Sequence, residues 1–191
     1  DRELSFLKAL ADNLKTLCSQ VSGRWNSSGS DSYLSKFVNA GSGSDEYPTQ
    51  LAAFEEVVNA MSGICEEVAG GKISEPFVAQ DPSLEESPYA QNSLKDFISN
   101  MKSVKNVYYG SYKTSGQGIK DYVRLYNLSL DARIKPDIDQ AIAALEAISD
   151  PFGLAISTQG TLVQQAITRI ETLKETLETQ LLPLIQQHIK E

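Results

Sequence analysis

The chain has 191 residues, of which 41% are apolar, so a single packed domain over residues 1–191 is expected and a disordered chain is excluded. The net charge of −8 and the lack of any Lys/Arg cluster argue against nucleic acid as a partner. No run of about eighteen apolar residues occurs, so no transmembrane segment is predicted.

The chain opens at Asp1 directly in a helical pattern, with no starting Met and no apolar segment typical of a signal peptide. We therefore expect a processed or truncated product. Cys18 and Cys65 fall on different predicted helices. One disulfide and two buried free thiols both remain open, and two distant cysteines are too few to suggest a zinc site.

The first predicted helix covers Arg2–Trp25 and ends at Gly23 and the polar Asn26–Ser30 cluster. Trp25 is expected to pack at that end; a ligand-binding role is the less favoured alternative. The apolar residues recur at helical spacing: Leu4, Leu7, Leu10, Ala11, Leu14, Leu17, Cys18 and Val21.

A short helix is predicted from Ser32 to about Ala40, followed by a Gly41–Asp45 loop. A second long helix should then carry Pro48 in its first turn and end at Gly70-Gly71. The connection Lys72–Gln91 contains three prolines, and loops of this length often have a function.

The central predicted helix begins at Asn92 or Ser93 and ends at Gly110. Its expected buried face is Leu94, Phe97, Ile98, Met101 and Val104. Amides, hydroxyls and tyrosine rings crowd this segment, although Asn is a poor residue in the interior of a helix. They indicate either capping and interhelical hydrogen bonds or a polar wall facing a binding site.

The remaining pattern is also helical. Residues Tyr112–Gly118 are interpreted as a connector because their glycines lack the spacing of a P-loop. A short helix, Ile119–Asn127, precedes a helix over Leu130–Ser149 that Ser129 should cap, with Pro136 within its first two turns. The last helix, from about Gln159, should bend at Pro183.

Strand signals are nearly absent, so the sequence predicts an all-α fold: an up-and-down four-helix bundle with additional short helices and no significant β structure.

No catalytic set with a buried histidine can be assembled from the sequence. An enzyme that relies only on paired carboxylates stays open, although Asp and Glu are spread along solvent faces, and we assign neither catalytic nor metal-binding residues. The one histidine, His188, lies three residues before Glu191, a spacing that can suit a metal. Because this pair falls in the fraying last turn, a solvated terminal histidine is favoured.

Three segments carry a family resemblance: SPYAQNSLKDF at Ser87–Phe97, NVYYGSY at Asn106–Tyr112, and the stretch Leu130–Ile156. They resemble the C-terminal half of the imelysin family, and the opening helix is similar to the one that follows that family's metal motif. The resemblance implies an all-helical protein of two four-helix bundles, located in the bacterial periplasm and in some cases anchored to the outer membrane as a lipoprotein. Family members are linked to iron uptake and were first described as insulin-cleaving metallopeptidases.

The family's GxHxxE metal motif has no counterpart here. Gln186 stands where the glycine should precede His188, and the pair is at the wrong end of the chain. The resemblance thus implies that iron or another divalent metal is held by the intact protein and not by this chain alone. The expected partners are a missing N-terminal half that bears the motif and, beyond it, envelope iron-transport components.

Two groups of residues match the family's motifs. Ser87, Asn92 and Ser93 match its SPY-x-x-NS segment, whereas Asn106, Tyr109 and Gly110 match its NVYxG segment. The hypothesis is that these six residues line the cleft between bundles and orient metal ligands supplied by the missing half. The alternative, that they cap helices and tie the loop to the bundle, remains open.

Among functions, a non-enzymatic role in iron binding and uptake ranks first, a metallopeptidase second, and a helical scaffold for another envelope protein third. Peptidase chemistry requires an activated water and a group that polarises the carbonyl, and these residues supply neither.

Overall fold

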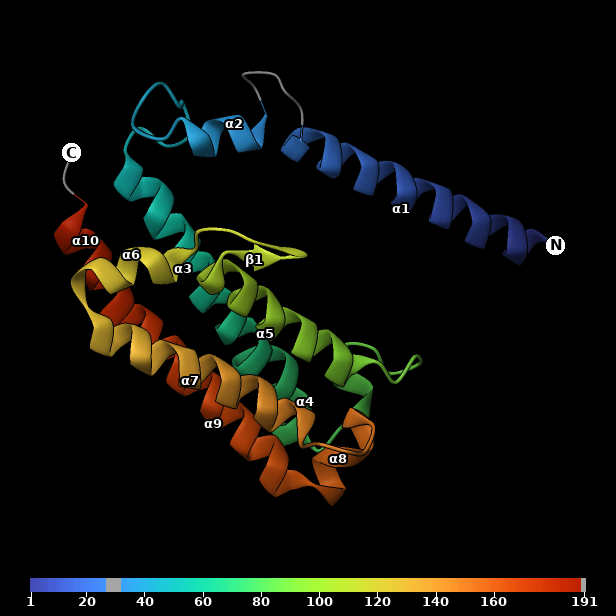
Figure 1. Ribbon diagram of the computed structural model, residues 1–191. Coiled ribbons are helices and arrows are strands. Elements are labelled where there is room, and N and C mark those ends of the chain that lie inside the picture. The colour runs from blue at the N-terminus through green and yellow to red at the C-terminus, as the bar shows by residue number, and fades with distance from the viewer. Residues whose placement is uncertain (27–31, 190–191) are drawn as a thin grey trace. The chain divides into compact units, whose positions relative to one another are not determined.

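The computed structural model describes residues 1–26 and 32–189 (Figure 1). The chain divides into two compact units, residues 1–54 with the extreme C-terminus, and residues 55–188. Helix α3, Gln50–Glu66, runs across the boundary. In the described residues, no helix is both long and apolar enough to cross a membrane.

The first unit contains α1, Arg2–Asn26, and α2, Tyr33–Val38, which matches the two predicted helices. Ser32 caps α2 by accepting a hydrogen bond from the Ser35 N–H at 3.0 Å. A small core forms where α2 meets the start of α3. Its members are Ala40, Tyr47 and Ala53, with Phe37 and Ala52 packed against them.

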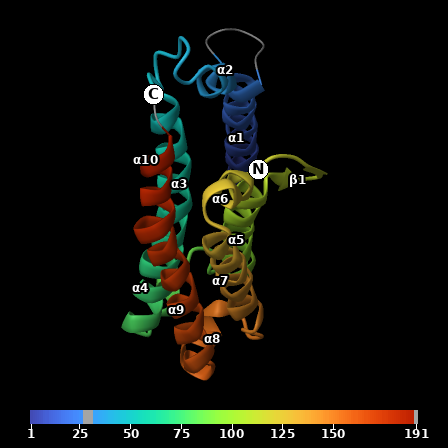
Figure 2. The same cartoon turned by 60° about the vertical axis from the view of Figure 1, so that its left-hand side comes forward.

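The second unit is an up-and-down bundle whose four long rods run beside one another (Figure 2). The rods are α3 with its continuation, α5 (Ser93–Tyr109), α7 (Leu128–Glu146), and α9 (Gly160–Thr176) with its continuation. Shorter helices join them: α6, Ile119–Tyr126, and α8, Phe152–Thr158. The predicted all-α bundle is confirmed. The described β structure is a two-residue pairing of β1, Ser111–Tyr112, with β2, Thr114–Ser115.

The core of this unit is built around α7, which packs against α9 and against α5. Phe97 of α5 and Phe152 of α8 meet edge-to-face at 5.2 Å, and both are fully buried. Leu94 and Ile98, predicted for the buried face of α5, are only half-buried. Tyr108 takes a core position instead, because its hydroxyl finds a buried acceptor on α7.

The prediction that Gly70-Gly71 ends the second long helix is wrong. The chain continues through a π-helical segment, η1, Glu67–Ile73, into α4, Ser74–Ala79, and leaves the helix only at Gln80 (φ 52°). A wider π turn keeps backbone hydrogen bonds in place around both glycines. The predicted long loop is therefore shorter, with a 3₁₀ turn, η2, at Pro82–Leu84.

Two helix starts also differ from the predictions. The N-cap of α7 is Asn127, whose Oδ1 accepts the Leu130 N–H at 2.9 Å, and not Ser129. Pro48 precedes α3 by two residues, and Thr49 Oγ1 accepts the Ala52 N–H at 3.1 Å. In both places a side chain one or two residues away from the predicted boundary satisfies the first free N–H groups.

The prolines inside helices are accommodated without ending them. Pro136 lies within the continuous helix α7. At the C-terminus, a π segment, η3, Leu177–Leu181, leads into α10, Leu182–His188, directly before Pro183. Pro183 has no N–H and cannot donate the helical hydrogen bond to the preceding turn. The π turn of η3 directly before it accommodates the missing bond.

Candidate functional site

The loop that enters α5 is fixed by a buried serine. Ser93 is 1% exposed; its Oγ accepts the Ser87 N–H at 3.0 Å and donates to Glu85 Oε2 at 2.8 Å. Glu85 is itself buried, against Gly153 of α8, where a side chain would come within 2.7 Å of its carboxylate. One hydroxyl thus joins two points of the loop to α5, and the Glu85 carboxylate that it holds lies close to the start of α8.

Asp96, in the first turn of α5, accepts hydrogen bonds from two predicted site residues. Its carboxylate accepts Ser87 Oγ–H at 2.8 Å and the Asn92 side-chain amide at 2.7 Å. Asn92 is the N-cap residue, yet its side chain makes no capping bond to the backbone. A carboxylate in the first turn also interacts favourably with the positive end of the helix dipole. The structure therefore brings Ser87, Asn92 and Ser93 together.

Lys72 attaches the same loop to the π segment η1. Its Nζ lies 2.9 Å from Glu86 and 3.1 Å from Glu67. Burial opposes its charge, but the hydrogen bonds to both glutamates outweigh it and raise the pKa of Lys72. The loop before α5 is thus anchored on both sides, by Ser93 and by Lys72.

The other matched group lies at the C-terminal end of α5. Gly110 ends the helix with φ 64°, and its N–H bonds to Asn106 O and Val107 O. A Cβ at Gly110 would come within 2.2 Å of the Gln117 backbone and 2.4 Å of Gly118 N. Only glycine allows this close crossing of two chain segments, so Gly110 has a structural role here.

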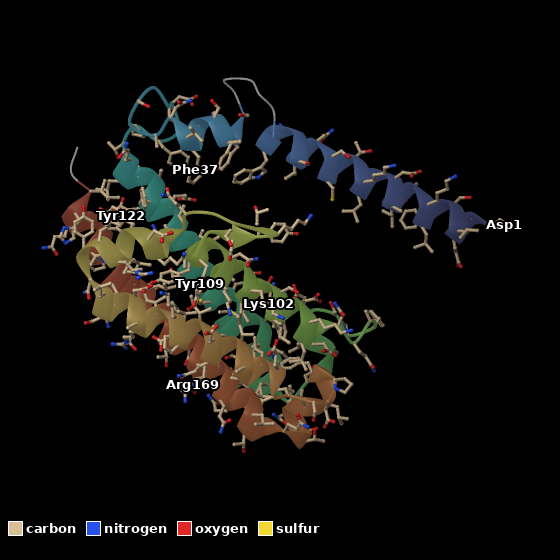
Figure 3. The ribbon with its side chains drawn as sticks, viewed as in Figure 1. Asp1, Phe37, Lys102, Tyr109, Tyr122 and Arg169 are labelled. Atoms are coloured by element: carbon tan, nitrogen blue, oxygen red, sulfur yellow. The ribbon has the colours of Figure 1, made fainter. Side chains whose placement is uncertain are left out.

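Tyr109 of α5 is half-buried beside Gly110 (Figure 3). The ammonium groups of two lysines lie near its ring. Lys105 Nζ is 5.7 Å and Lys135 Nζ 6.0 Å from the ring centroid. Lys105 also pairs with Asp139 at 2.7 Å. Burial, reinforced by Asp139, raises the pKa of the Tyr109 hydroxyl, so it remains a neutral donor.

The sequence analysis missed a buried polar contact behind Tyr109. Tyr108 is fully buried and donates its hydroxyl proton to Asp131 Oδ1 at 3.0 Å. Lys135 Nζ lies 2.5 Å from Asp131 Oδ2, and Arg124 Nε 3.8 Å. Burial, and then the hydrogen bond to Asp131, raise the pKa of Tyr108 far above its usual range. The one signal in the sequence was the Asp131–Lys135 spacing of four on a helix.

His188 differs from its prediction as a solvated terminal residue. Its ring stacks on Tyr126 of α6, with centroids 4.0 Å apart and planes 20° apart. Tyr126 in turn packs against Tyr122 at 5.1 Å. The last turn of α10 is therefore packed against α6 through this stack, and Glu191 lies outside the described residues.

Both cysteines are free thiols. Cys18 is exposed on α1, whereas Cys65 is buried on α3. Burial raises the pKa of Cys65 to about 12.

The two matched groups lie at opposite ends of α5. Asn92 and Gly110 flank a helix of 17 residues, which corresponds to about 25 Å. The six residues can follow one wall of a cleft, but they cannot all surround one ion. Within residues 1–26 and 32–189, no group of three or more His, Cys, Asp or Glu side chains is placed to hold a metal.

The fold and these contacts define the class of protein: an all-helical bundle in which hydrogen-bonded polar residues gather at both ends of helix α5. The sequence profile of the family Imelysin (Peptidase_M75) matches residues 1–180. The chain therefore belongs to the imelysin family.

Known relatives share the sequence and the fold. The chain is 31% identical over 185 residues to "Iron-regulated protein A" of Synechococcus elongatus, covering 94% of this chain and 52% of the relative. The crystal structure of an imelysin peptidase from Bacteroides ovatus matches with a TM-score of 0.78 at 30% identity, covering 90% of this chain and 51% of that one. A Parabacteroides distasonis protein, provisionally named an iron-regulated protein A precursor, has the same fold (TM-score 0.85, 23% identity, 98% of this chain and 56% of that one). The chain thus spans about half the length of the relatives it matches.

Proposed function

We propose that this chain forms one wall of the cleft in an imelysin-type protein that binds iron, or another divalent metal, for uptake in a bacterial envelope. The family match and the relative named Iron-regulated protein A support the link to iron. The observation that carries the proposal is the ordered loop before α5, in which Ser93, Glu85 and Asp96 fix the positions of Ser87 and Asn92.

The metal donors in this proposal come from a second region, of the kind that accounts for the rest of the relatives' length. The described residues do not fit a metal site by themselves, since no three donor side chains converge. What they offer is a set of hydroxyl and amide groups already held in place by buried or charge-assisted hydrogen bonds. Such groups can orient metal-binding side chains without touching the metal.

Both ends of α5 belong to the proposed wall. Ser87 and Asn92 form one end, where the buried Ser93 holds Ser87, and Asn106 and Tyr109 form the other, next to the helix end at Gly110. Because about 25 Å separates them, we assign them to a cleft that follows the helix and not to one coordination sphere.

The proposed location is the bacterial periplasm, where the full-length protein would be anchored to the outer membrane. The Parabacteroides relative is described as a precursor, which agrees with an exported protein. Components of an envelope iron-transport system are the expected partners.

A double substitution, Ser87→Ala with Asn92→Ala, tests the proposal in the full-length protein. Iron affinity, measured by calorimetry, should fall about tenfold, in the range seen when groups that orient metal ligands are removed. Ser99→Ala serves as the matched control, since the exposed Ser99 hydroxyl only bonds the Lys95 carbonyl. Unchanged iron affinity together with a lowered melting temperature would leave these residues a purely structural role.

A metallopeptidase is the second candidate, favoured by the name of the Bacteroides relative. Incubating the full-length protein with an unfolded peptide, with and without chelator, separates the two. Cleavage that the chelator abolishes supports the peptidase. Metal retained without any cleavage supports iron binding.

A further inference from the structure

The C-terminal end of α5 gathers positive charge in a chain that is acidic overall. The ion-paired residues there are Lys105 on α5, Arg124 on α6, and Asp131, Lys135 and Asp139 on α7. Three cations around two carboxylates leave a net positive charge, whereas the whole chain carries −8. We call these five residues, together with Tyr109, the Tyr109 cluster.

The nearby helix ends do not cancel this charge. The start of α6 lies against the end of α5, where a Cβ at Gly118 would come within 2.4 Å of the Tyr109 backbone carbon. The partial positive charge of one helix end therefore lies beside the partial negative charge of the other.

Both carboxylates of the cluster are already held by lysines. Asp131 is 6% exposed, and its two oxygens accept the Tyr108 hydroxyl at 3.0 Å and Lys135 Nζ at 2.5 Å. Asp139 accepts Lys105 Nζ at 2.7 Å.

Hydrogen-bond donors remain in excess after these bonds are made. An ammonium group carries three N–H donors and no acceptor. Lys105 and Lys135 each give one donor to a carboxylate, which leaves two on each lysine without an acceptor in the described part of the chain. The Tyr109 hydroxyl likewise has no hydrogen-bond partner among residues 1–26 and 32–189. Burial, reinforced by Asp139, raises the pKa of this hydroxyl, so it stays a protonated donor.

The two ammonium groups and the phenol are held in one place. Both Nζ atoms lie within 6.0 Å of the Tyr109 ring centroid, a range in which an aromatic ring attracts a cation. Lys105 comes from α5 and Lys135 from α7, so the packing of two long helices sets their spacing. The hydrogen bond to Asp139 raises the pKa of Lys105, so this side chain is a cation at neutral pH.

A bare metal ion does not suit this cluster, because a cation is repelled by the net positive charge and needs lone pairs where the free groups are donors. An anion meets both requirements. A single carboxylate reaches one ammonium group and the phenol, whereas an anion with several carboxylates can bond both lysines. Phosphate sites typically use arginine forks or backbone N–H groups, and the one arginine here is exposed beside Asp131.

We propose that the Tyr109 cluster binds a small anion that carries two or more carboxylate groups, through the ammonium groups of Lys105 and Lys135 and the hydroxyl of Tyr109. This inference deepens the proposed function and rests on it in one respect, since the anion is taken to be the chelator that accompanies iron as cargo. The ligand at this end of the wall is then an anionic iron complex.

Calorimetry on the full 191-residue chain at low ionic strength tests the site, with citrate as the probe. Pyrophosphate has a similar charge without a carboxylate, and acetate has one carboxylate. We expect one citrate per chain, bound at least about tenfold more tightly than either comparison anion, as for one additional hydrogen bond to a charged group.

Matched variants test which groups make the contact. Lys105→Gln with Asp139→Asn leaves the net charge unchanged and should weaken citrate binding about tenfold, because one ammonium group is lost. Lys102, on the same helix as Tyr109 (Figure 3), pairs with Glu146 at 3.3 Å between the same two helices. Lys102→Gln with Glu146→Gln is therefore the control and should change the affinity less than about twofold.

Lysine acetylation, read by mass spectrometry, locates the bound anion. Saturating citrate should slow the acetylation of Lys105 and Lys135 at least about threefold, because their N–H groups are then engaged. The rate at Lys102 should stay the same.

The full-length protein separates a free anion from an iron complex. Lys105→Gln with Asp139→Asn should weaken the binding of ferric citrate about tenfold and leave the affinity for iron(II) without chelator within about twofold. Unchanged binding of ferric citrate in this variant defeats the link to iron cargo.

Several outcomes overturn the inference. These are a chain that does not bind citrate, equally tight binding of pyrophosphate or acetate, and full citrate affinity in the Lys105→Gln, Asp139→Asn variant. Equal protection of Lys102 and Lys105 shows only diffuse attraction and also defeats it. Citrate binding by the cluster in a protein without affinity for iron leaves the anion site intact and defeats the proposed function. Iron affinity that depends on Ser87 and Asn92, without any citrate binding, defeats this inference alone.

Discussion

Helices α1 and α5 carry the same kind of apolar periodicity, but the apolar side of α5 is buried and that of α1 is exposed. On α5, Phe97, Met101 and Val104 are completely buried against α7 and its neighbours. On α1, Leu7 and Leu14 remain largely in water. The comparison shows that periodicity identifies the side of a helix that is suited to burial, while the rest of the polypeptide decides what covers it.

The two helices also differ in how they use polar groups. On α5, the two buried hydroxyls reach residues outside the helix, Ser93 to Glu85 and Tyr108 to Asp131, whereas the exposed Ser99 hydroxyl bonds its own helix. On α1, the Ser5 and Thr16 hydroxyls bond carbonyls four residues earlier on the same helix. Such local bonds add little to tertiary stability, whereas the bonds of α5 fix its neighbours.

The largest contrast should come from truncating one apolar side chain on each helix. Phe97→Ala is expected to lower the free energy of unfolding by about 4 kcal/mol, because it leaves a cavity against Phe152. Leu14→Ala should change it by less than about 0.5 kcal/mol, as for exposed residues in general. Urea denaturation of the full chain measures both. A large loss for Leu14→Ala would mean that the chain already buries the apolar side of α1.

The next largest difference in the free energy of unfolding is expected between two glycine substitutions, one at the end of α5 and one in α1. Gly110→Ala should destabilise by about 3 kcal/mol, because φ is 64° and a methyl group would overlap the Gln117 and Gly118 backbone. Gly23→Ala on α1 meets nothing within 4 Å and should stabilise by about 0.5 kcal/mol through helix propensity. Thermal unfolding followed by circular dichroism compares them. Equal effects at the two positions would contradict the close crossing at Gly110.

A smaller difference is expected for two serines. Ser93→Ala removes the link from the Ser87 N–H to Glu85, leaves a buried carboxylate without this donor, and should cost about 2 kcal/mol. Ser5→Ala removes an exposed bond to Asp1 O and should cost less than about 0.5 kcal/mol. Hydrogen exchange should show faster opening of the loop before α5 only in the first variant. If that loop stays protected, Ser93 is not its anchor.

The smallest effect concerns the two thiols at alkaline pH. The folded-state pKa of Cys65 is raised from its ordinary 9.0 to about 12, so its contribution to stability is complete below pH 9 and decreases as pH rises toward 12. At pH 10 the loss should be about 1 kcal/mol. Cys65→Ala should flatten this slope, and Cys18→Ala should leave it unchanged. Unfolding free energies measured between pH 8 and 10 check both, and the same slope in all three proteins would contradict the assignment to Cys65.

Much of the fold could be predicted because helix boundaries depend on local chemistry. Gly110 was predicted to end the central helix, and the structure confirms it with a left-handed backbone that glycine adopts readily. Gly70-Gly71 carried the same signal but lies inside a π segment. The difference arises because neighbouring helices keep Gly70-Gly71 within a continuous helix. The residues next to these glycines in the sequence do not contain that information.

The candidate site could be predicted only as a list of residues. The sequence placed Ser87, Asn92 and Ser93 near a helix start, and the structure adds that Glu85 and Asp96 hold them. Asp131 was missed as the partner of Tyr108, since the two are 23 residues apart. Long-range pairs of this kind depend on how α5 and α7 pack, which the sequence of neither helix specifies.

The sequence by itself determined the all-helical class, the order of the long helices and the apolar side of each, because these follow from spacing and from backbone preferences. Only the tertiary structure decided which apolar sides are covered, which carboxylates are buried with a donor, and where a helix continues through glycine or proline. The physical reason is that burial and long-range hydrogen bonds are properties of contacts between elements, and a residue's own neighbours in the chain do not fix them.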